Sequence, residues 1–380
     1  GSPSAKPAYK RVLHAVYSPG TNISYDTEVS TQITNHMMCI WLDTYMPVLQ
    51  KTQKNNVGNR STVHEKTRET VVFGVAVANI FTGKTAIFEH QSSFYLSPTT
   101  FDELERYVSV YSPSEIIILS PFDTPVVDKI LQFSGVQTTT VHIVDTRNQQ
   151  NERVQNCTKQ KYIQHILRTF FSEETYDICA ELHTNQIATQ AFCYLMNFIQ
   201  EHNPNLVKNM ELPIFNNLST RMLLANHTLK QLNIIENTES HASSGPFSSV
   251  SKFLNKCSTA IGRRQFYTQI VNPVFDVDWL NGEYRMIDHM LQPTVYDMVA
   301  PIRKTMHDIC DVEKIMRQLM VQKVYPSSLH KLWKSIKTVQ QLNVCIAEDA
   351  EIGDYLSYGH SYRPRDVSAN LYIEQLTSHI

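Results

Sequence analysis

The sequence predicts an α/β domain followed by an all-α domain, and two observations support this prediction. In the first half, apolar runs rich in β-branched residues alternate with helix-like segments, which is typical of helices packed on a partly parallel sheet. In the second half, apolar residues recur at helical spacing. The expected organisation is a tag or linker at 1–10, an α/β domain at 11–205 and an incomplete helical domain at 206–380.

Composition narrows the class of protein. The chain has 380 residues, 42% of them hydrophobic and 18% charged, enough for two or three globular domains. A formal net charge of −2 gives no overall basic signal for nucleic acid. The seven cysteines include no C-x-x-C pair, which argues against a zinc site or a disulfide framework and favours a reducing, intracellular compartment. No apolar run approaches the roughly 18–20 residues of a membrane span.

The elements of the first half follow from these patterns. Strands are expected at 11–17, 71–80, 85–89, 114–120 and 138–144, and helices at 100–111, 124–133, 160–171 and 185–202. Residues 81–84 predict a hairpin turn in which Gly83 supplies the positive φ, so the sheet should be mixed. Thr100 and Glu103 have the spacing of a capping box. Residues 37–49 are interpreted as helix-like or irregular, and 51–70 as a surface loop.

Gly83-Lys84-Thr85 has the ending of a phosphate-binding P-loop. That loop also needs a glycine five residues earlier, where this chain has Ala78, and a following helix where this chain predicts a strand. A hairpin turn is the better interpretation.

The second half is organised around the stretch 258–273, which predicts one short helix. Ser258 or Thr259 can cap its start, because a hydroxyl accepts a hydrogen bond from a first-turn N–H. Gly262 lies in the first turn, where a glycine suits the close approach of another backbone or helix. Pro273 ends the helix.

Two further features of this stretch point to a structural role. Arg263 and Arg264 are successive, so they point about 100° apart, and one can meet a buried carboxylate while the other faces solvent. Asp276 predicts the cap of a second helix. We therefore expect a helix, a proline corner and an Asp-capped helix, with the arginines bound to carboxylates within or between domains.

Helical spacing continues along 250–261, 294–309, 311–319 and 325–342. Residues 301–340 hold eight Lys or Arg against three acidic residues, a local charge of +5. Such a surface could face DNA. The cations show no interleaved aromatic residues on the same side, however, so a solvated helix face is the preferred interpretation.

Several of these motifs resemble the MutS family of DNA mismatch repair proteins. Gly262-Arg263-Arg264, then Pro273, then the Asp276-capped helix resemble the family's helical lever domain, and Ser18-Pro19-Gly20-Thr21 is similar to the motif that opens its connector domain. The stretch 222–237 resembles the entry to the lever, although Ala225, Gln231 and Asn233 depart from the family pattern. These departures favour a divergent branch, such as the giant-virus and octocoral-mitochondrial group, with meiotic relatives as the alternative.

The resemblance implies a ribonuclease-H-like connector followed by part of a lever, taken from the middle of a longer protein. The fragment would have no catalytic, cofactor or metal site of its own. Its parent would be a dimeric, DNA-dependent ATPase that uses ATP and Mg²⁺ and binds mismatched double-stranded DNA. The fragment would couple these two activities. Gly262, Arg263, Arg264, Pro273 and Asp276 would act as structural or interdomain residues. The location would be nuclear, mitochondrial, in a host cytoplasm or in a virion.

Two alternatives stay open from the residues. A ribonuclease-H-like nuclease needs three or four acidic side chains gathered at strand ends to hold two metal ions. The two most apolar strands, 71–80 and 114–120, carry only Glu115, with Asp123, Asp145 and Glu181 outside them. A helical scaffold unrelated to repair is the second alternative, and it predicts no Walker motif in the longer gene.

Overall fold

The chain forms two compact units in the computed structural model, which describes residues 18–21, 35–46, 69–136, 138, 140–171, 180–208, 210–215, 226–235, 245 and 247–357. The α/β unit takes in the described residues up to 215, together with 226–232 and 316–324. The helical unit takes in the remaining described residues from 233 to 357. The expected strand at 11–17, most of the expected loop at 51–70 and the tail from 358 lie outside the described residues.

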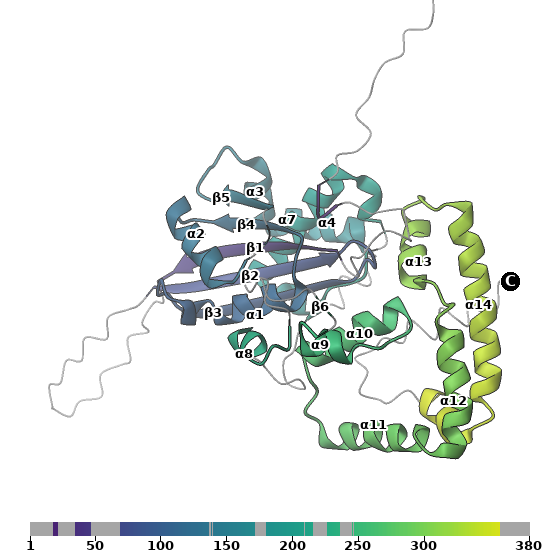
Figure 1. Ribbon diagram of the computed structural model, residues 1–380. Coiled ribbons are helices and arrows are strands. Elements are labelled where there is room, and N and C mark those ends of the chain that lie inside the picture. Colours follow the sequence, from purple (N-terminus) through teal and green to yellow (C-terminus); the bar gives the residue numbers. More distant parts are fainter. Residues whose placement is uncertain are drawn as a thin grey trace, which may run out of the picture. The chain divides into compact units, whose positions relative to one another are not determined.

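A six-stranded mixed sheet forms the centre of the α/β unit (Figure 1). Its strands are β1 (His36–Tyr45), β2 (Thr70–Asn79), β3 (Thr85–Ser93), β4 (Glu115–Ser120), β5 (Val141–Asp145) and β6 (Ile214–Phe215), in the order β5-β4-β1-β2-β3-β6. Neighbours β1–β2 and β2–β3 are antiparallel, whereas β1–β4, β4–β5 and β3–β6 are parallel. The predicted hairpin between β2 and β3 is confirmed, with Gly83 at φ 81°.

The expectation of a helix-like or irregular segment at 37–49 is wrong, because β1 runs through it at the centre of the sheet. A short, continuous apolar run cannot be assigned to strand or helix by periodicity alone. The sheet resolves the ambiguity by burying both faces of the strand. Met38, Ile40 and Leu42 pack on one side and Met37, Cys39 and Trp41 on the other, as the two-residue repeat of a strand requires.

Helices cover both faces of the sheet (Figure 1). One face packs against α1 (Asp102–Tyr111) and α2 (Thr124–Phe133). The other packs against α3 (Glu152–Cys157), α4 (Gln160–Phe170), α6 (Ala180–Thr184), α7 (Gln186–His202) and the 3₁₀ turn η2 (Pro204–Leu206). The short helix α8 (Asn226–Gln231) contacts α1. These elements confirm the expected helices of the first half to within a few residues.

The capping box expected at Thr100 and Glu103 is wrong. Thr100 belongs to a 3₁₀ turn, η1 (Pro98–Thr100), and α1 begins two residues later. Phe101 occupies the cap position without a side-chain hydrogen bond to the helix. Its ring is fully buried in the core, so burial of the ring decides where the helix starts.

Helix α7 lies unusually close to β2. A Cβ atom on Gly74 would lie 2.3 Å from the backbone N of Ala188 and 2.3 Å from the carbonyl carbon of Ile187. Glu89 Oε2 of β3 accepts hydrogen bonds from the N–H groups of Ile187 (2.8 Å) and Ala188 (3.0 Å). A carboxylate at a helix N-terminus is favourable, so the β2–β3 hairpin determines where α7 packs.

The helical unit confirms the all-α prediction for the second half. Its helices are α9 (Val250–Leu254), α10 (Ala260–Val271), α11 (Val277–Met290), α12 (Pro293–Met306), α14 (Pro326–Ile346) and α15 (Ala350–Ser357). Helix α12 packs against α11 and α14, and α14 against α15. The division between the two units falls inside one further helix, α13 (Val312–Met320), between Ile315 and Met316.

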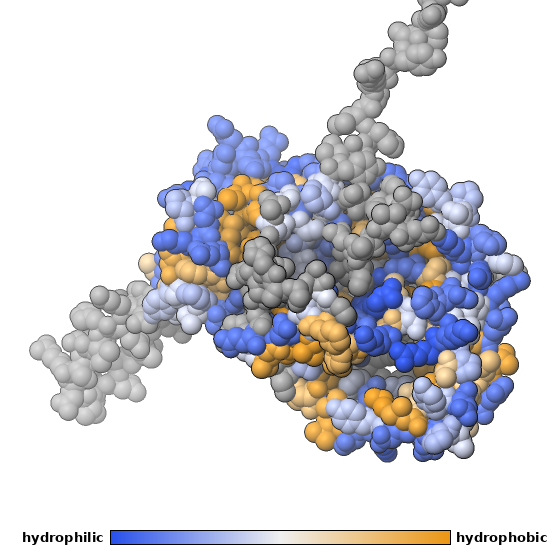
Figure 2. All heavy atoms as spheres, viewed as in Figure 1, coloured by the Kyte–Doolittle hydropathy of each residue, from blue (hydrophilic) through white to orange (hydrophobic). Residues whose placement is uncertain are grey.

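Apolar side chains stay exposed along α11. Val277, Tyr284 and Ile287, with the adjoining Leu291, are between 47% and 67% exposed. Figure 2 shows hydrophobic atoms at the lower edge of the view, where Figure 1 places α11. Within the described residues, no helix is long and apolar enough to cross a membrane.

Candidate functional site

The start of α10 is built as the sequence predicts. Thr259 takes the cap position, and its Oγ1 accepts a hydrogen bond of 3.0 Å from the N–H of Gly262. Ser258, the other candidate, donates its hydroxyl to the carbonyl of Arg303 at 3.3 Å. The cap therefore satisfies one of the N–H groups that a helix leaves without an intrahelical partner.

Gly262 is confined by the residues that precede its own helix. A Cβ atom there would lie 3.0 Å from Thr259 Oγ1 and 3.3 Å from Cys257 Cβ. The atoms nearest to this position thus belong to the capping turn, whereas the sequence predicted the close approach of another backbone or helix. A side chain at 262 would compete with the cap hydrogen bond for the same space.

The two arginines that follow have different partners. Arg263 Nη1 donates to the carbonyls of Cys257 (3.3 Å) and Ser258 (3.4 Å), just before its own helix. Arg264 donates from Nη1 to Asp311 Oδ2 at 2.7 Å and from Nη2 to Asp311 Oδ1 at 2.8 Å. Its Nη2 also reaches Glu313 Oε2 at 2.6 Å. The expected carboxylate partners are therefore found at Arg264, and they lie in the same helical unit.

We call Arg264, Asp311 and Glu313 the Arg264 cluster. Its side chains are 11%, 19% and 28% exposed. Desolvation works against the charge on Arg264, but the hydrogen bond and attraction from Asp311, with the attraction of Glu313, raise the pKa of the guanidinium above its ordinary value. The cluster holds its charges by bidentate geometry, the strong form of an arginine–carboxylate pair.

Asp311 also caps the start of α13. Its Oδ1 accepts a hydrogen bond from the N–H of Lys314 at 3.3 Å, as a helix cap does. Burial lowers the pKa of the Lys314 ammonium, and the charge of Asp311 opposes that shift. One carboxylate thus caps α13 and joins it to α10.

The corner between α10 and α11 also follows the predicted pattern. Helix α10 ends at Val271, two residues before Pro273. Asp276 caps α11, and its Oδ1 accepts from the N–H of Trp279 at 3.0 Å. The local structure expected at Pro273 and Asp276 is present, Gly262 lies in the first turn of α10 as expected, and the interdomain role of all three residues stays a prediction.

The sequence patterns did not predict the structural role of one buried carboxylate in the α/β unit. Glu115 is fully buried at the start of β4. Its Oε2 accepts from Ser18 Oγ at 2.5 Å and from the N–H of Gly20 at 2.8 Å, and its Oε1 lies 2.6 Å from His142 Nε2. Glu115 therefore binds the turn at 18–21, the resemblance motif, to the sheet. An acidic residue opening an otherwise apolar strand was the signal for it.

The other acidic candidates for metal-dependent cleavage are held separately. Asp123 Oδ1 and Asp145 Oδ1 both accept from Arg147, at 2.8 and 3.1 Å. The hydrogen bonds from Arg147 lower the pKa of Asp145. The side chain of Glu181 lies outside the description. Within the described ranges, no group of three or more His, Cys, Asp or Glu residues is arranged to hold a metal ion.

The basic helix α14 differs from the sequence expectation in one respect. Lys337 Nζ lies 3.9 Å from the ring centroid of Trp333, and the ring of His330 lies 5.8 Å from it. Trp333 is 48% exposed. Spacings of three and four residues place these side chains on one helix face, so an aromatic residue does lie among the cations.

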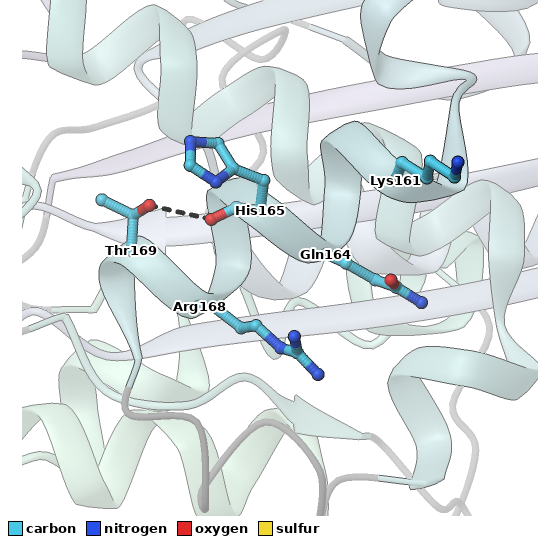
Figure 3. Close-up of a pocket in the computed structure, with 5 residues that line it drawn as sticks. All are labelled: Lys161, Gln164, His165, Arg168 and Thr169. Atoms are coloured by element: carbon cyan, nitrogen blue, oxygen red, sulfur yellow. Dashed lines mark hydrogen bonds between the residues drawn. The ribbon is translucent and has the colours of Figure 1, made fainter.

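A shallow depression lies along α4 (Figure 3). It is lined by Lys161, Gln164, His165, Arg168 and Thr169, all from that one helix. Thr169 Oγ1 donates to the carbonyl of His165 at 2.8 Å, as Figure 3 shows. In that view the side chains of Lys161, Gln164 and Arg168 do not converge on a common point. These side chains are therefore not placed to act together on one bound molecule.

Comparison with known proteins identifies the helical half. Residues 227–373 match the family model of MutS domain III. This part of the chain is similar to the MutS family. A putative DNA mismatch repair protein mutS homolog of Acanthamoeba polyphaga mimivirus is 21% identical over 360 residues, covering 90% of this chain and 30% of the relative.

Two further relatives are also named as DNA mismatch repair proteins. The mitochondrial DNA mismatch repair protein mutS homolog of Sarcophyton glaucum is 24% identical over 172 residues, covering 44% of this chain and 14% of its own. DNA mismatch repair protein MutS of Fusobacterium nucleatum is 24% identical over 361 residues, covering 93% of this chain and 34% of its own. The chain thus spans about a third or less of these relatives, which include a giant-virus protein and an octocoral mitochondrial protein, as the sequence motifs suggested.

Proposed function

We propose that this chain is the non-catalytic middle part of a MutS-like mismatch repair protein and couples mismatch binding to ATP binding elsewhere in that protein. The observation that carries the proposal is the division of α13. Its first turn belongs to the helical unit and the rest to the α/β unit. A continuous helix is stiff along its axis, so it suits the transmission of a displacement between discrete arrangements.

The start of α13 supports this role. Asp311 and Glu313 join it to Arg264 of α10 by three charged hydrogen bonds. The first turn of α13 is therefore fastened to α10 within the helical unit. Gly262, Arg263, Pro273 and Asp276 shape the two ends of α10 and its corner with α11, which is the structural role we propose for them.

The activity of the longer protein is part of the same proposal. The relatives are named as DNA mismatch repair proteins. We propose that the parent is a DNA-dependent ATPase that uses ATP and Mg²⁺, binds mismatched double-stranded DNA and acts as a dimer. We also propose that it works inside the cell. The connector would correspond to 11–205 and the lever to 206–380, with 1–10 a tag or linker.

The nuclease alternative finds little support in the acidic residues. Both carboxylate oxygens of Glu115 are taken up within the fold, and Arg147 holds Asp123 and Asp145. A ribonuclease-H-like reaction needs such carboxylates free to bind metal.

The experiment has two arms. The parent reading frame is sequenced, and a G-x-x-x-x-G-K-[ST] motif is expected downstream of residue 380. The isolated chain is then incubated with ATP, and with duplex DNA and RNA in Mg²⁺ or Mn²⁺. We expect neither hydrolysis nor cleavage from the chain, and DNA-stimulated ATP hydrolysis from the parent. A parent without the motif would favour the unrelated scaffold, and cleavage by the chain would favour the nuclease.

A further inference from the structure

Arg317 is a buried arginine in the part of α13 that belongs to the α/β unit. It is 1% exposed and is among the largest fully buried side chains of the described residues. Its Nη1 donates to the carbonyl of Lys208 at 2.6 Å, and its Nη2 donates to the carbonyl of Leu206. These carbonyls lie at the end of η2 and just after it, so one guanidinium joins α13 to the segment that follows α7.

The same guanidinium lies against the turn between β2 and β3. A Cβ atom on Gly83 would lie 3.3 Å from Arg317 Nη1 and 3.4 Å from its Cζ. The carbonyl of Gly83 accepts from the N–H of Glu211 at 2.9 Å, and Thr85 Oγ1 donates to the carbonyl of Glu211 at 2.8 Å. Arg317 therefore contacts Leu206 and Lys208 and lies against the hairpin turn, which is itself joined to Glu211.

The charge of Arg317 persists in this setting. Burial lowers the pKa of the guanidinium to about 10, and the nearby carboxylate of Glu211 opposes that shift. The side chain thus stays protonated at neutral pH and can keep donating to both carbonyls. Lysine cannot replace it, because an ammonium lacks the planar fork that reaches two acceptors at once.

Six residues separate Arg317 from Asp311, which is about 9 Å along a helix axis. Backbone hydrogen bonds from Ile315 N–H to Asp311 O and from Val321 N–H to Arg317 O continue the helix through this region. We propose that Arg317 is the positioning residue through which a displacement of α13 reaches the segment 206–211 and the β2–β3 turn. This inference rests on the proposed coupling function and names its route.

The experiment is a double-mutant cycle read by hydrogen–deuterium exchange on the whole chain. Arg317→Lys and Arg317→Met remove one or both carbonyl contacts. Asp311→Asn perturbs the first turn of α13, in the helical unit. Arg303→Met is the matched control, because Arg303 also donates to a backbone carbonyl, that of Lys256 at 3.1 Å, but lies exposed in α12.

Arg317→Lys is expected to raise exchange about tenfold at amides of 206–211 and 316–321, and Arg317→Met more. Arg303→Met should leave both segments unchanged. Asp311→Asn should raise exchange at 206–211 in the chain with Arg317, but should add nothing in the Arg317 variants. If Arg317→Met does not fold, the cycle is completed with Arg317→Lys.

Two results would overturn the inference, and they differ in meaning. Unchanged exchange at 206–211 in a folded Arg317→Lys chain would show that Arg317 does not hold that segment, while the coupling function could use another route. The second result is that the Arg317 variants raise exchange at 206–211 as expected but Asp311→Asn does not. It would show that a change at the start of α13 does not reach this segment, and it would contradict the proposed coupling within this chain.

Discussion

Arg264 of α10 holds Asp311, at the start of α13, by two parallel hydrogen bonds of 2.7 and 2.8 Å. Asp311 at the same time caps α13 through the N–H of Lys314. One carboxylate therefore determines where α13 begins and which helix it is joined to. The pair is mostly shielded from water, so its loss leaves a charge that is neither hydrated nor paired.

Arg264→Met is expected to destabilise the helical unit by about 3 kcal/mol, because it leaves Asp311 and Glu313 without their cation. Urea unfolding followed by tryptophan fluorescence measures this in a Trp41→Phe background, where Trp279 and Trp333 report on the helical unit. The exposed Arg303→Met serves as the control and should change stability little. Equal effects of the two variants would contradict the role of the pair.

Gly262→Leu is expected to destabilise the helical unit by about 2 kcal/mol through overpacking. A Cβ atom already comes within 3.0 Å of Thr259 Oγ1, so a larger side chain must displace the cap. Thr259→Ala, which removes the cap without adding volume, should cost about 1 kcal/mol. Thermal unfolding compares the two variants, and an unchanged melting curve for Gly262→Leu would count against the crowded capping turn.

Gly74→Ala is expected to destabilise the α/β unit by about 3 kcal/mol or more, because its methyl group would meet the backbone of α7 at 2.3 Å. Gly353→Ala in α15 is the matched control. Its nearest neighbour is 4.0 Å away, so alanine should be neutral or stabilise the helix by up to about 1 kcal/mol. Urea midpoints should separate the two variants. Similar midpoints would mean that α7 can move away from β2 at low cost.

His36 should make the α/β unit less stable as the pH falls. Burial lowers its pKa from 6.5 to about 4, although a hydrogen bond with the backbone of Tyr111 opposes the shift. Between pH 6.5 and about 4, His36 is therefore protonated in the unfolded chain but stays neutral in the folded chain. The contribution of His36 to the stability of the folded chain is fully present above pH 6.5 and is lost as the pH falls from 6.5 toward 4.

His36→Gln should flatten that part of the pH profile, whereas His330→Gln, on the exposed face of α14, should not. Urea unfolding between pH 4 and 8 gives the comparison. A profile in which both variants keep the wild-type slope would assign the pH dependence to other groups.

Local sequence patterns predicted the elements whose signals are local. The strands at 71–80 and 114–120 and the helix at 124–133 combine apolar runs with clear ends. The caps at Thr259 and Asp276 need only a side chain three residues from an N–H. At 37–49 and at Thr100 the local pattern failed, because burial of β1 and of Phe101 outweighed propensity and capping.

The sequence by itself determined the order of an α/β half and a helical half, the cap of α10 and the motifs of the family. Those properties depend on residues close together in the chain. The tertiary structure alone decided that Arg264 meets Asp311, that Glu115 binds the turn at 18–21 and that Arg317 lies beneath the β2–β3 hairpin. Each joins residues 47 to more than 230 positions apart, and only packing of the core brings such groups together.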